Sequence, residues 1–161
     1  MGRRHLEEAG ITFADFIETG SEFALPQLCE RLAGRFDFVF VDGWHTFDHT
    51  LLDCFYATRL LRVGGYLAVD DTAFASVRRA VEFISTYPCY ERFASVRRPS
   101  ARSWARRLAG LAVRLIPRRV SALVLAPHWQ HRLFDDQTTH MIVLKKIQED
   151  LRPWNWHNDA F

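Results

Sequence analysis

The sequence of 161 residues lacks several features that would place it in a familiar class of protein. No apolar run approaches the ~18–20 residues that a membrane-spanning helix needs, and the N-terminal residues lack the apolar core of a secretory signal. The three cysteines form no CxxC pair, so a zinc or iron–sulfur site has no support in the sequence. Repeats and low-complexity tracts are also missing. These absences favour a cytoplasmic globular protein with free thiols and a single domain over residues 1–161.

Residues 97–119 hold eight arginines and no acidic residue. Since the whole sequence has a net charge of +2, the remaining residues carry a net charge of −6. Within this stretch, residues 101–116 have the pattern of a basic amphipathic helix with Trp104, Leu108 and Leu115 on its apolar face. Four interpretations stay open: a cover over a substrate site, a helix on a membrane surface, an RNA-binding face, or a solvated helix packed on the sheet edge. The pattern favours the last of these, and we expect no nucleic-acid partner.

The most informative stretch is 36–72, which predicts two parallel strands joined by a helix. Residues 36–41 are mostly apolar, as in a strand buried on both faces, and the strand stops at an Asp-Gly turn. Thr46 is placed to cap a helix that Gly64-Gly65 would end, and residues 66–69 form the second strand. Both strands of such a right-handed unit end at the same edge of the sheet. We therefore expect the polar residues that follow them to meet there: Asp42, Trp44, His45, Asp70 and Asp71.

The flanking sequence predicts further alternation of strands and helices. The expected elements are a helix ending before Gly10, a strand over 12–17, a helix over 22–32 capped by Ser21, a helix over 76–85, a strand over 90–96 and a last strand over 139–146. Residues 97–138 then form an insertion before the last strand. The eight glycines are scattered, and none forms the glycine-rich turn that follows the first strand of a doubly wound sheet. The predicted fold is therefore an incomplete α/β fold, the second half of a doubly wound sheet with an inserted basic helix.

Three segments carry a family resemblance: IETGSEFALPQL, FDFVFVDGWH and LLRVGGYLAVDD. Their order and spacing resemble the class I S-adenosylmethionine-dependent methyltransferases, above all the small-molecule O-methyltransferases of the catechol and caffeoyl-coenzyme A type. The resemblance covers about residues 4–96 and, more weakly, the last strand. It implies a Rossmann-like fold, S-adenosylmethionine as cofactor, and methyl transfer to a hydroxyl oxygen of a small molecule or sugar.

The resemblance also implies which residues bind the methyl donor. Ser21 and Glu22 match the positions that contact the adenine ring, and Trp44 matches the residue that packs against that ring. Asp42 would lie between the donor and a divalent cation, and Gly43 completes the cofactor-binding turn. All five residues are expected to bind the cofactor.

Metal binding and proton transfer are implied by the same resemblance. Asp42, Asp70 and Asp71 match the positions that hold a divalent cation, Mg²⁺ or another, although relatives often have asparagine at the last position. His45 takes the place of the lysine that serves as general base in the family. Histidine suits that role because its unperturbed pKa of ~6.5 allows proton abstraction near neutrality.

Each of these residues also has a structural interpretation. Aspartates commonly end strands and cap helices, and a tryptophan commonly packs in a core. His45 and His49 are four residues apart at a helix start, a spacing that can hold zinc, but the glutamate and third ligand of such a site are missing. The residue types alone do not choose between these interpretations.

A second class of function stays open, namely a non-catalytic, truncated methyltransferase-like domain or partner subunit. The missing glycine turn motivates it, because that turn would bring backbone N–H groups to the donor. We expect these 161 residues to bind S-adenosylmethionine poorly and to self-associate or need a partner chain, because the strand over 12–17 would present an unpaired apolar edge.

Overall fold

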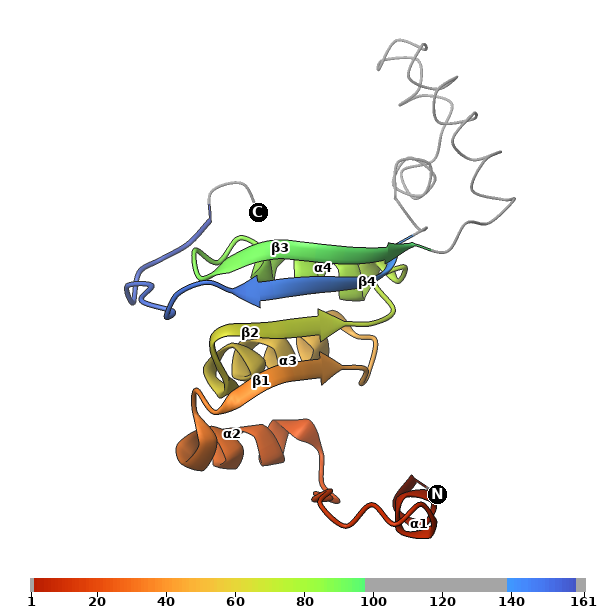
Figure 1. The fold of residues 1–161 in the computed structure, drawn as a ribbon. Helices are drawn as coiled ribbons and strands as arrows, with labels where there is room; N and C mark the ends of the chain where they lie inside the picture. The colour runs from red at the N-terminus through yellow and green to blue at the C-terminus, as the bar shows by residue number, and fades with distance from the viewer. Residues whose placement is uncertain (1, 98–138, 159–161) are drawn as a thin grey trace, which may run out of the picture.

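The computed structural model describes residues 2–97 and 139–158, which form a sheet with helices packed against one of its faces (Figure 1). In chain order the elements are α1 (Gly2–Glu8), α2 (Ser21–Leu32), β1 (Phe36–Val41), α3 (Phe47–Leu60), β2 (Leu61–Val69), α4 (Ala75–Ile84), β3 (Tyr90–Arg97) and β4 (Thr139–Lys146). The helix predicted over 101–116 and the insertion after Arg97 lie outside the described residues. Among the described helices, none is long and apolar enough to cross a membrane.

The sheet has four strands in the order β1-β2-β4-β3. β1 and β2 are parallel, as the crossover unit requires, whereas β4 runs antiparallel to both of its neighbours. α3 and α4 lie behind the sheet in Figure 1, on the same face. This mixed α/β arrangement is consistent with part of the Rossmann-like fold that the sequence predicts.

The hydrophobic core lies between the sheet and the two helices α3 and α4. Leu67, Ile142 and Leu144 are at most 3% exposed on the strands, and the helix face that packs nearby is equally buried. The buried residues of α4 are Val77, Ala80, Val81 and Ile84. Their i, i+3, i+4, i+7 spacing aligns them along one side of the helix.

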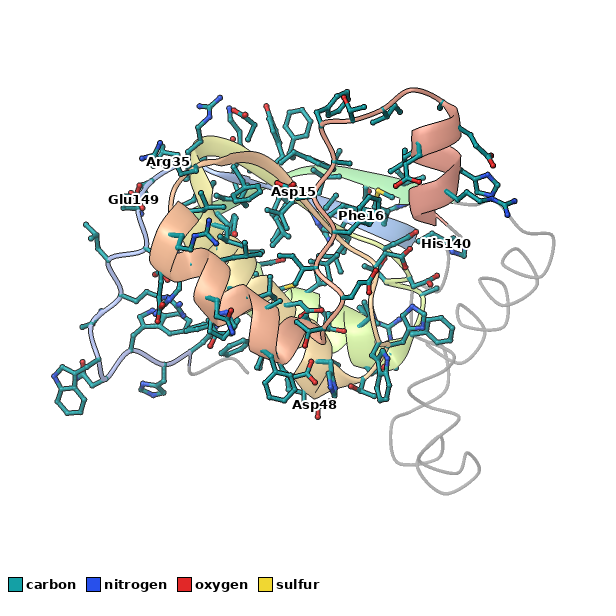
Figure 2. All side chains as sticks on the ribbon, turned by 90° about the horizontal axis from the view of Figure 1, so that it is seen from below. Asp15, Phe16, Arg35, Asp48, His140 and Glu149 are labelled. Atoms are coloured by element: carbon teal, nitrogen blue, oxygen red, sulfur yellow. The ribbon has the colours of Figure 1, made fainter. Side chains whose placement is uncertain are left out.

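The strand predicted over 12–17 is wrong: residues 11–18 have no regular secondary structure. A strand needs a neighbour to accept and donate its backbone hydrogen bonds, and among the described strands β1 pairs only with β2. Phe13 is consequently 87% exposed and Phe16 44%. Figure 2, drawn from the side of α2, shows Asp15 and Phe16 on the segment that connects α1 to α2.

Two predicted boundaries were also wrong. The pair Gly64-Gly65 does not end α3, which stops at Leu60; both glycines lie inside β2. Gly64 has φ of +88°, a left-handed conformation that glycine adopts without strain, and the pairing of β1 with β2 is irregular beside it. Ser21 is the first residue of α2 rather than its cap, since Gly20 takes the cap position.

No described helix covers the sheet face opposite α3 and α4 (Figure 1). Phe38 and Phe40 of β1 are 55% and 47% exposed, and Phe93 of β3 is 59% exposed. The paired residues Phe38 and Tyr66 share this face, and the Tyr66 ring contacts Phe93 at 4.9 Å between centroids. Aromatic side chains therefore form an exposed surface across the sheet.

β4 holds the loop after β2 in place at one end and α3 at the other. Near its start, the Thr72 backbone N–H donates to His140 O at 3.0 Å and the Thr72 hydroxyl donates to Thr139 O at 3.1 Å. At its end, the buried Lys146 ammonium donates to Thr58 O at 3.1 Å and to Leu61 O at 2.8 Å. The turn that carries Asp71 is thus tied to a strand anchored in the core.

Candidate active site

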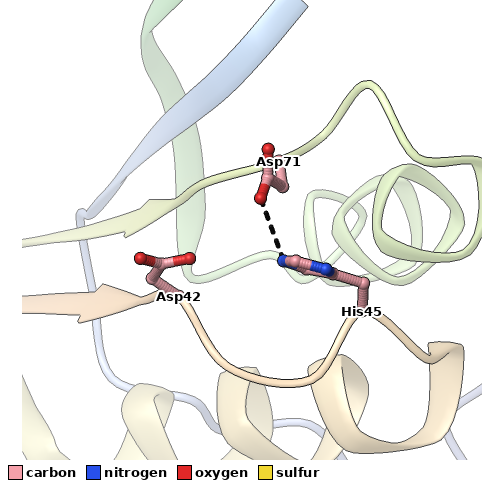
Figure 3. Close-up of side chains that lie close together, drawn as sticks. All are labelled: Asp42, His45 and Asp71. Atoms are coloured by element: carbon pink, nitrogen blue, oxygen red, sulfur yellow. Dashed lines mark ion pairs between the residues drawn. The ribbon is translucent and has the colours of Figure 1, made fainter.

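Three predicted site residues meet at the carboxyl edge of the sheet. Asp42 directly follows β1, His45 lies in the loop before α3, and Asp71 follows β2 (Figure 3). One potential ligand atom from each lies within 4.8 Å of the others. The closest approach joins His45 Nε2 to Asp71 Oδ2 at 2.9 Å, between side chains that are 42% and 36% exposed. We call these three residues the Asp-His-Asp cluster.

The Asp70 side chain makes different contacts from the Asp71 side chain. Its backbone N–H donates to Val41 O at 3.0 Å, and its Oδ1 accepts the backbone N–H of Asp71 at 2.8 Å. Asp71 itself has φ of +52°, and it is the non-glycine residue with positive φ in the described part of the chain. Aspartate tolerates that conformation better than most residues do. The sharp turn sends the Asp71 carboxylate toward His45, while the Asp70 carboxylate stabilises the turn.

His45 is held by contacts on several sides. Its ring stacks on Phe74 with centroids 4.9 Å apart and an interplanar angle of 14°. Its backbone carbonyl accepts the hydroxyl of Ser76 at 2.5 Å. With Asp71 bound to Nε2, the imidazole orientation is fixed, and Nδ1 is the ring nitrogen left to exchange a proton.

A cavity of about 390 Å³ adjoins the cluster on the side of α2. Ser21, Glu22, Gly43 and Trp44, four of the five predicted cofactor-binding residues, line it together with Gly20, His49 and Asp53. The Trp44 ring lies 5.2 Å from the His49 ring at an angle of 37° and is 74% exposed. The cavity therefore combines acidic side chains with an accessible aromatic surface.

The remaining predicted residue, Asp42, lines a second cavity of about 220 Å³. Ser21, Gly43 and Asp53 belong to the walls of both cavities, which places the two side by side. Together they run along the carboxyl end of β1. The five residues predicted to bind the cofactor therefore line one or both of these neighbouring cavities, and their role in binding stays a prediction.

Asp53 was missed by the sequence prediction. It lies in α3, is only 8% exposed, and its Oδ1 atom is buried without a hydrogen-bond partner among the described residues. Burial raises the pKa of its carboxyl group, which the nearby charge of Glu22 raises further, while a hydrogen bond with Ser21 and the charge of His49 oppose the shift. An acid at position 53 among apolar and small helix residues was the signal available in the sequence.

The donor set of the cluster fits a divalent cation. Its three potential ligand atoms lie within 4.8 Å of one another, so they would have to move slightly closer to share one ion. Two carboxylates suit a hard cation such as Mg²⁺, whereas an imidazole ligand shifts the preference toward transition metals. The same geometry also suits an imidazole that is oriented by a carboxylate to accept a proton.

Comparison with known proteins adds one finding. Residues 3–72 match the family model for a methyltransferase domain, a match that covers less than half of the chain and contains every predicted site residue. A search of curated proteins gave no match for the chain. The family match supports a methyltransferase family for this part of the chain, in line with the resemblance of its three segments.

Proposed function

We propose that this domain is an S-adenosylmethionine-dependent methyltransferase that transfers the methyl group to a hydroxyl oxygen of a small molecule or sugar, assisted by a divalent cation. The observation that carries the proposal is the position of the Asp-His-Asp cluster beside two cavities at the carboxyl edge of a parallel strand pair. Ligands of open α/β sheets bind at this edge. The family match supports methyl transfer in general, and the site chemistry suggests oxygen as the acceptor atom.

The donor would lie along the end of β1. Ser21 and Glu22 offer hydroxyl and carboxylate groups to an adenine ring, and the exposed Trp44 ring offers a stacking surface. Glycine at position 43 leaves space between the backbone and Asp53, because a Cβ there would lie 3.2 Å from Asp53 Oδ2. Methyl transfer from a sulfonium is an in-line displacement, so the main task of these residues is to position the donor.

The cluster would prepare the acceptor oxygen. Asp42 and Asp71 would hold the cation, with Asp70 as the third predicted ligand if its carboxylate turns away from the Asp71 backbone. A bound cation would lower the pKa of a coordinated substrate hydroxyl. His45 would take the hydroxyl proton at Nδ1, while Asp71 stabilises the resulting imidazolium through Nε2.

A labelled-donor assay tests this function. The protein is incubated with S-adenosylmethionine labelled in its methyl group and a panel of catechols, sugars and amines, with Mg²⁺ or with a chelator. We expect label on hydroxyl acceptors in the presence of Mg²⁺ and a loss of labelling with the chelator. Labelling confined to amines, or labelling indifferent to the chelator, would contradict the proposed reaction.

A second candidate function is a non-catalytic subunit, and the uncovered aromatic face favours it. Phe38, Phe40 and Phe93 would bury their exposed area against another chain or a second copy of this one. In that case the cluster and cavities would be retained without turnover. Donor binding without label transfer to any acceptor would support this second candidate over the first.

A further inference from the structure

The chain after β2 passes from one neighbouring strand to the other at Asp71. The backbone N–H of Asp70 donates to Val41 O, at the end of β1, at 3.0 Å. The backbone N–H of Thr72 donates instead to His140 O of β4, also at 3.0 Å. Asp71 lies between these two bonds with φ of +52°. Because a non-glycine residue keeps such a conformation only where its surroundings hold it, the contacts of its neighbours determine where the Asp71 side chain points.

Thr72 makes a second bond to β4 through its side chain. Its hydroxyl donates to the backbone O of Thr139, the first residue of β4, at 3.1 Å, and Thr72 is 0% exposed. Among side chains of this size, only those of threonine and serine carry an O–H donor so near the backbone. On the other side of Asp71, the Asp70 carboxylate accepts the Asp71 N–H at 2.8 Å. The Thr72 hydroxyl therefore holds one side of Asp71 and the Asp70 carboxylate holds the other.

The position of Asp71 in turn affects the other members of the Asp-His-Asp cluster. Its Oδ2 lies 2.9 Å from His45 Nε2, and its carboxylate also belongs to the group of potential ligand atoms that includes Asp42. The backbone O of Asp71 accepts the N–H of Phe74 at 2.9 Å, and the Phe74 ring stacks on the His45 ring. A change in the Asp71 backbone would therefore displace both of the groups that hold the imidazole.

We propose that Thr72 is a positioning residue of this site, whose hydroxyl bond to β4 holds Asp71 where its carboxylate reaches His45 and a bound cation. The cation part rests on the proposed function, whereas the contact with His45 exists without a cation. Removing a group that orients a metal ligand typically weakens metal binding about 10- to 100-fold. A threonine that only stabilised the fold would lower Tm and leave the cation affinity of the folded protein unchanged.

Binding of Mn²⁺ measures the effect of Thr72 without turnover. Mn²⁺ alone is titrated into the protein, and the free ion is read from its electron paramagnetic resonance signal. Thr72→Val keeps the shape of the side chain and the backbone bond but removes the hydroxyl. We expect it to raise the dissociation constant of Mn²⁺ about 10- to 100-fold. Thr72→Ser keeps the hydroxyl and should bind Mn²⁺ nearly as tightly as the wild type.

Thr58→Val is the matched control. Thr58 is 1% exposed, its hydroxyl donates to Cys54 O at 2.8 Å and accepts the Tyr90 hydroxyl at 3.0 Å, and it lies about three turns from the start of α3. The control should lower Tm at least as much as Thr72→Val and leave the Mn²⁺ affinity unchanged. If Thr72→Val does not fold, Thr72→Ser and Thr72→Ala give the same comparison, because these two variants differ by one oxygen atom.

The His45 ring gives a second measurement that needs no metal. Its C–H chemical shifts include the ring current of the stacked Phe74 ring, and His45→Gln identifies its signals among those of the seven histidines. In Thr72→Val we expect these shifts to move toward the values of an unstructured histidine. They should stay at their wild-type values in Thr72→Ser and in Thr58→Val.

The outcomes separate the role of Thr72 from the proposed function. Unchanged Mn²⁺ affinity in Thr72→Val, or an equal loss of affinity in Thr58→Val, overturns the role of Thr72 and leaves the proposed function standing. If the wild type does not bind Mn²⁺, the cation is removed from the proposed function, and the His45 shifts then decide the role of Thr72: unmoved shifts in Thr72→Val overturn it.

Discussion

Replacing Lys146 by methionine should destabilise the protein by about 2 kcal/mol. Lys146 is 2% exposed, and its ammonium donates to Thr58 O, Leu61 O and Glu149 Oε2 at 3.1, 2.8 and 3.0 Å. Methionine keeps the apolar stem but leaves two buried carbonyl groups without this donor, at ~1–3 kcal/mol each. Removing a desolvated ammonium returns part of that cost, which brings the net effect to about 2 kcal/mol.

Thermal unfolding followed by circular dichroism measures this effect. For a domain of this size, about 2 kcal/mol corresponds to a decrease in Tm of about 4–8 °C. Lys145→Met is the matched control, because the neighbouring side chain points to the other face of β4 and is partly exposed. Its Tm should change little. Equal Tm values for Lys146→Met and Lys145→Met would refute the claim that Lys146 anchors β4 to α3.

Three further predictions concern the site and the uncovered face. If the cluster binds a cation, Tm should be higher in millimolar Mg²⁺ than in a chelator, because binding at 100 times Kd stabilises the folded state by about 2.7 kcal/mol. Asp42→Asn should remove this increase. Equal Tm values in Mg²⁺ and in the chelator would count against a metal site. His45→Ala should lower kcat about 10²–10⁴-fold with donor affinity nearly unchanged, and a wild-type-like rate across pH 6–8 would remove His45 from the mechanism. Phe38→Ser with Phe40→Ser should reduce self-association in light scattering, whereas Trp154→Ser, at a residue 97% exposed, should not; an unchanged molar mass in the double variant would exclude this face as the interface.

The gathering of the site residues was predictable because topology alone determines it. Parallel strands joined by a right-handed crossover end at one edge, so Asp42 and Asp71 had to lie near each other whatever their side-chain contacts. The pairing of His45 with Asp71 was not predictable. It depends on the positive φ of Asp71 and on the Phe74 ring, neither of which leaves a periodic signal. Sequence reasoning therefore located the edge but not the partner of each group.

The buried face of α3 shows why packing was harder to predict. By their helical spacing Leu52, Phe55, Tyr56 and Leu60 share one face of α3, but of these four residues only Leu60 is buried. The buried positions of α3 instead hold small or polar residues, namely Thr50, Asp53, Cys54, Ala57, Thr58 and the terminal Leu60. This helix is enclosed by the sheet and by contacts with both α2 and α4, so little space is left at its inner face. Under such conditions a prediction from hydrophobicity alone selects the wrong face of the helix, and for this reason the buried Asp53 was missed.

Binding of S-adenosylhomocysteine, read at the indole N–H of Trp44, tests the central claim most directly. Trp44 lines the larger cavity, whereas Trp154 is 97% exposed and belongs to neither cavity, so the two indole signals in one ¹⁵N spectrum form an internal comparison. The account predicts a saturable shift of the Trp44 signal, with affinity weaker than micromolar, and no shift at Trp154. An unchanged Trp44 signal at millimolar ligand, or equal shifts of both signals, would contradict the assignment of this edge of the sheet as the methyl-donor site.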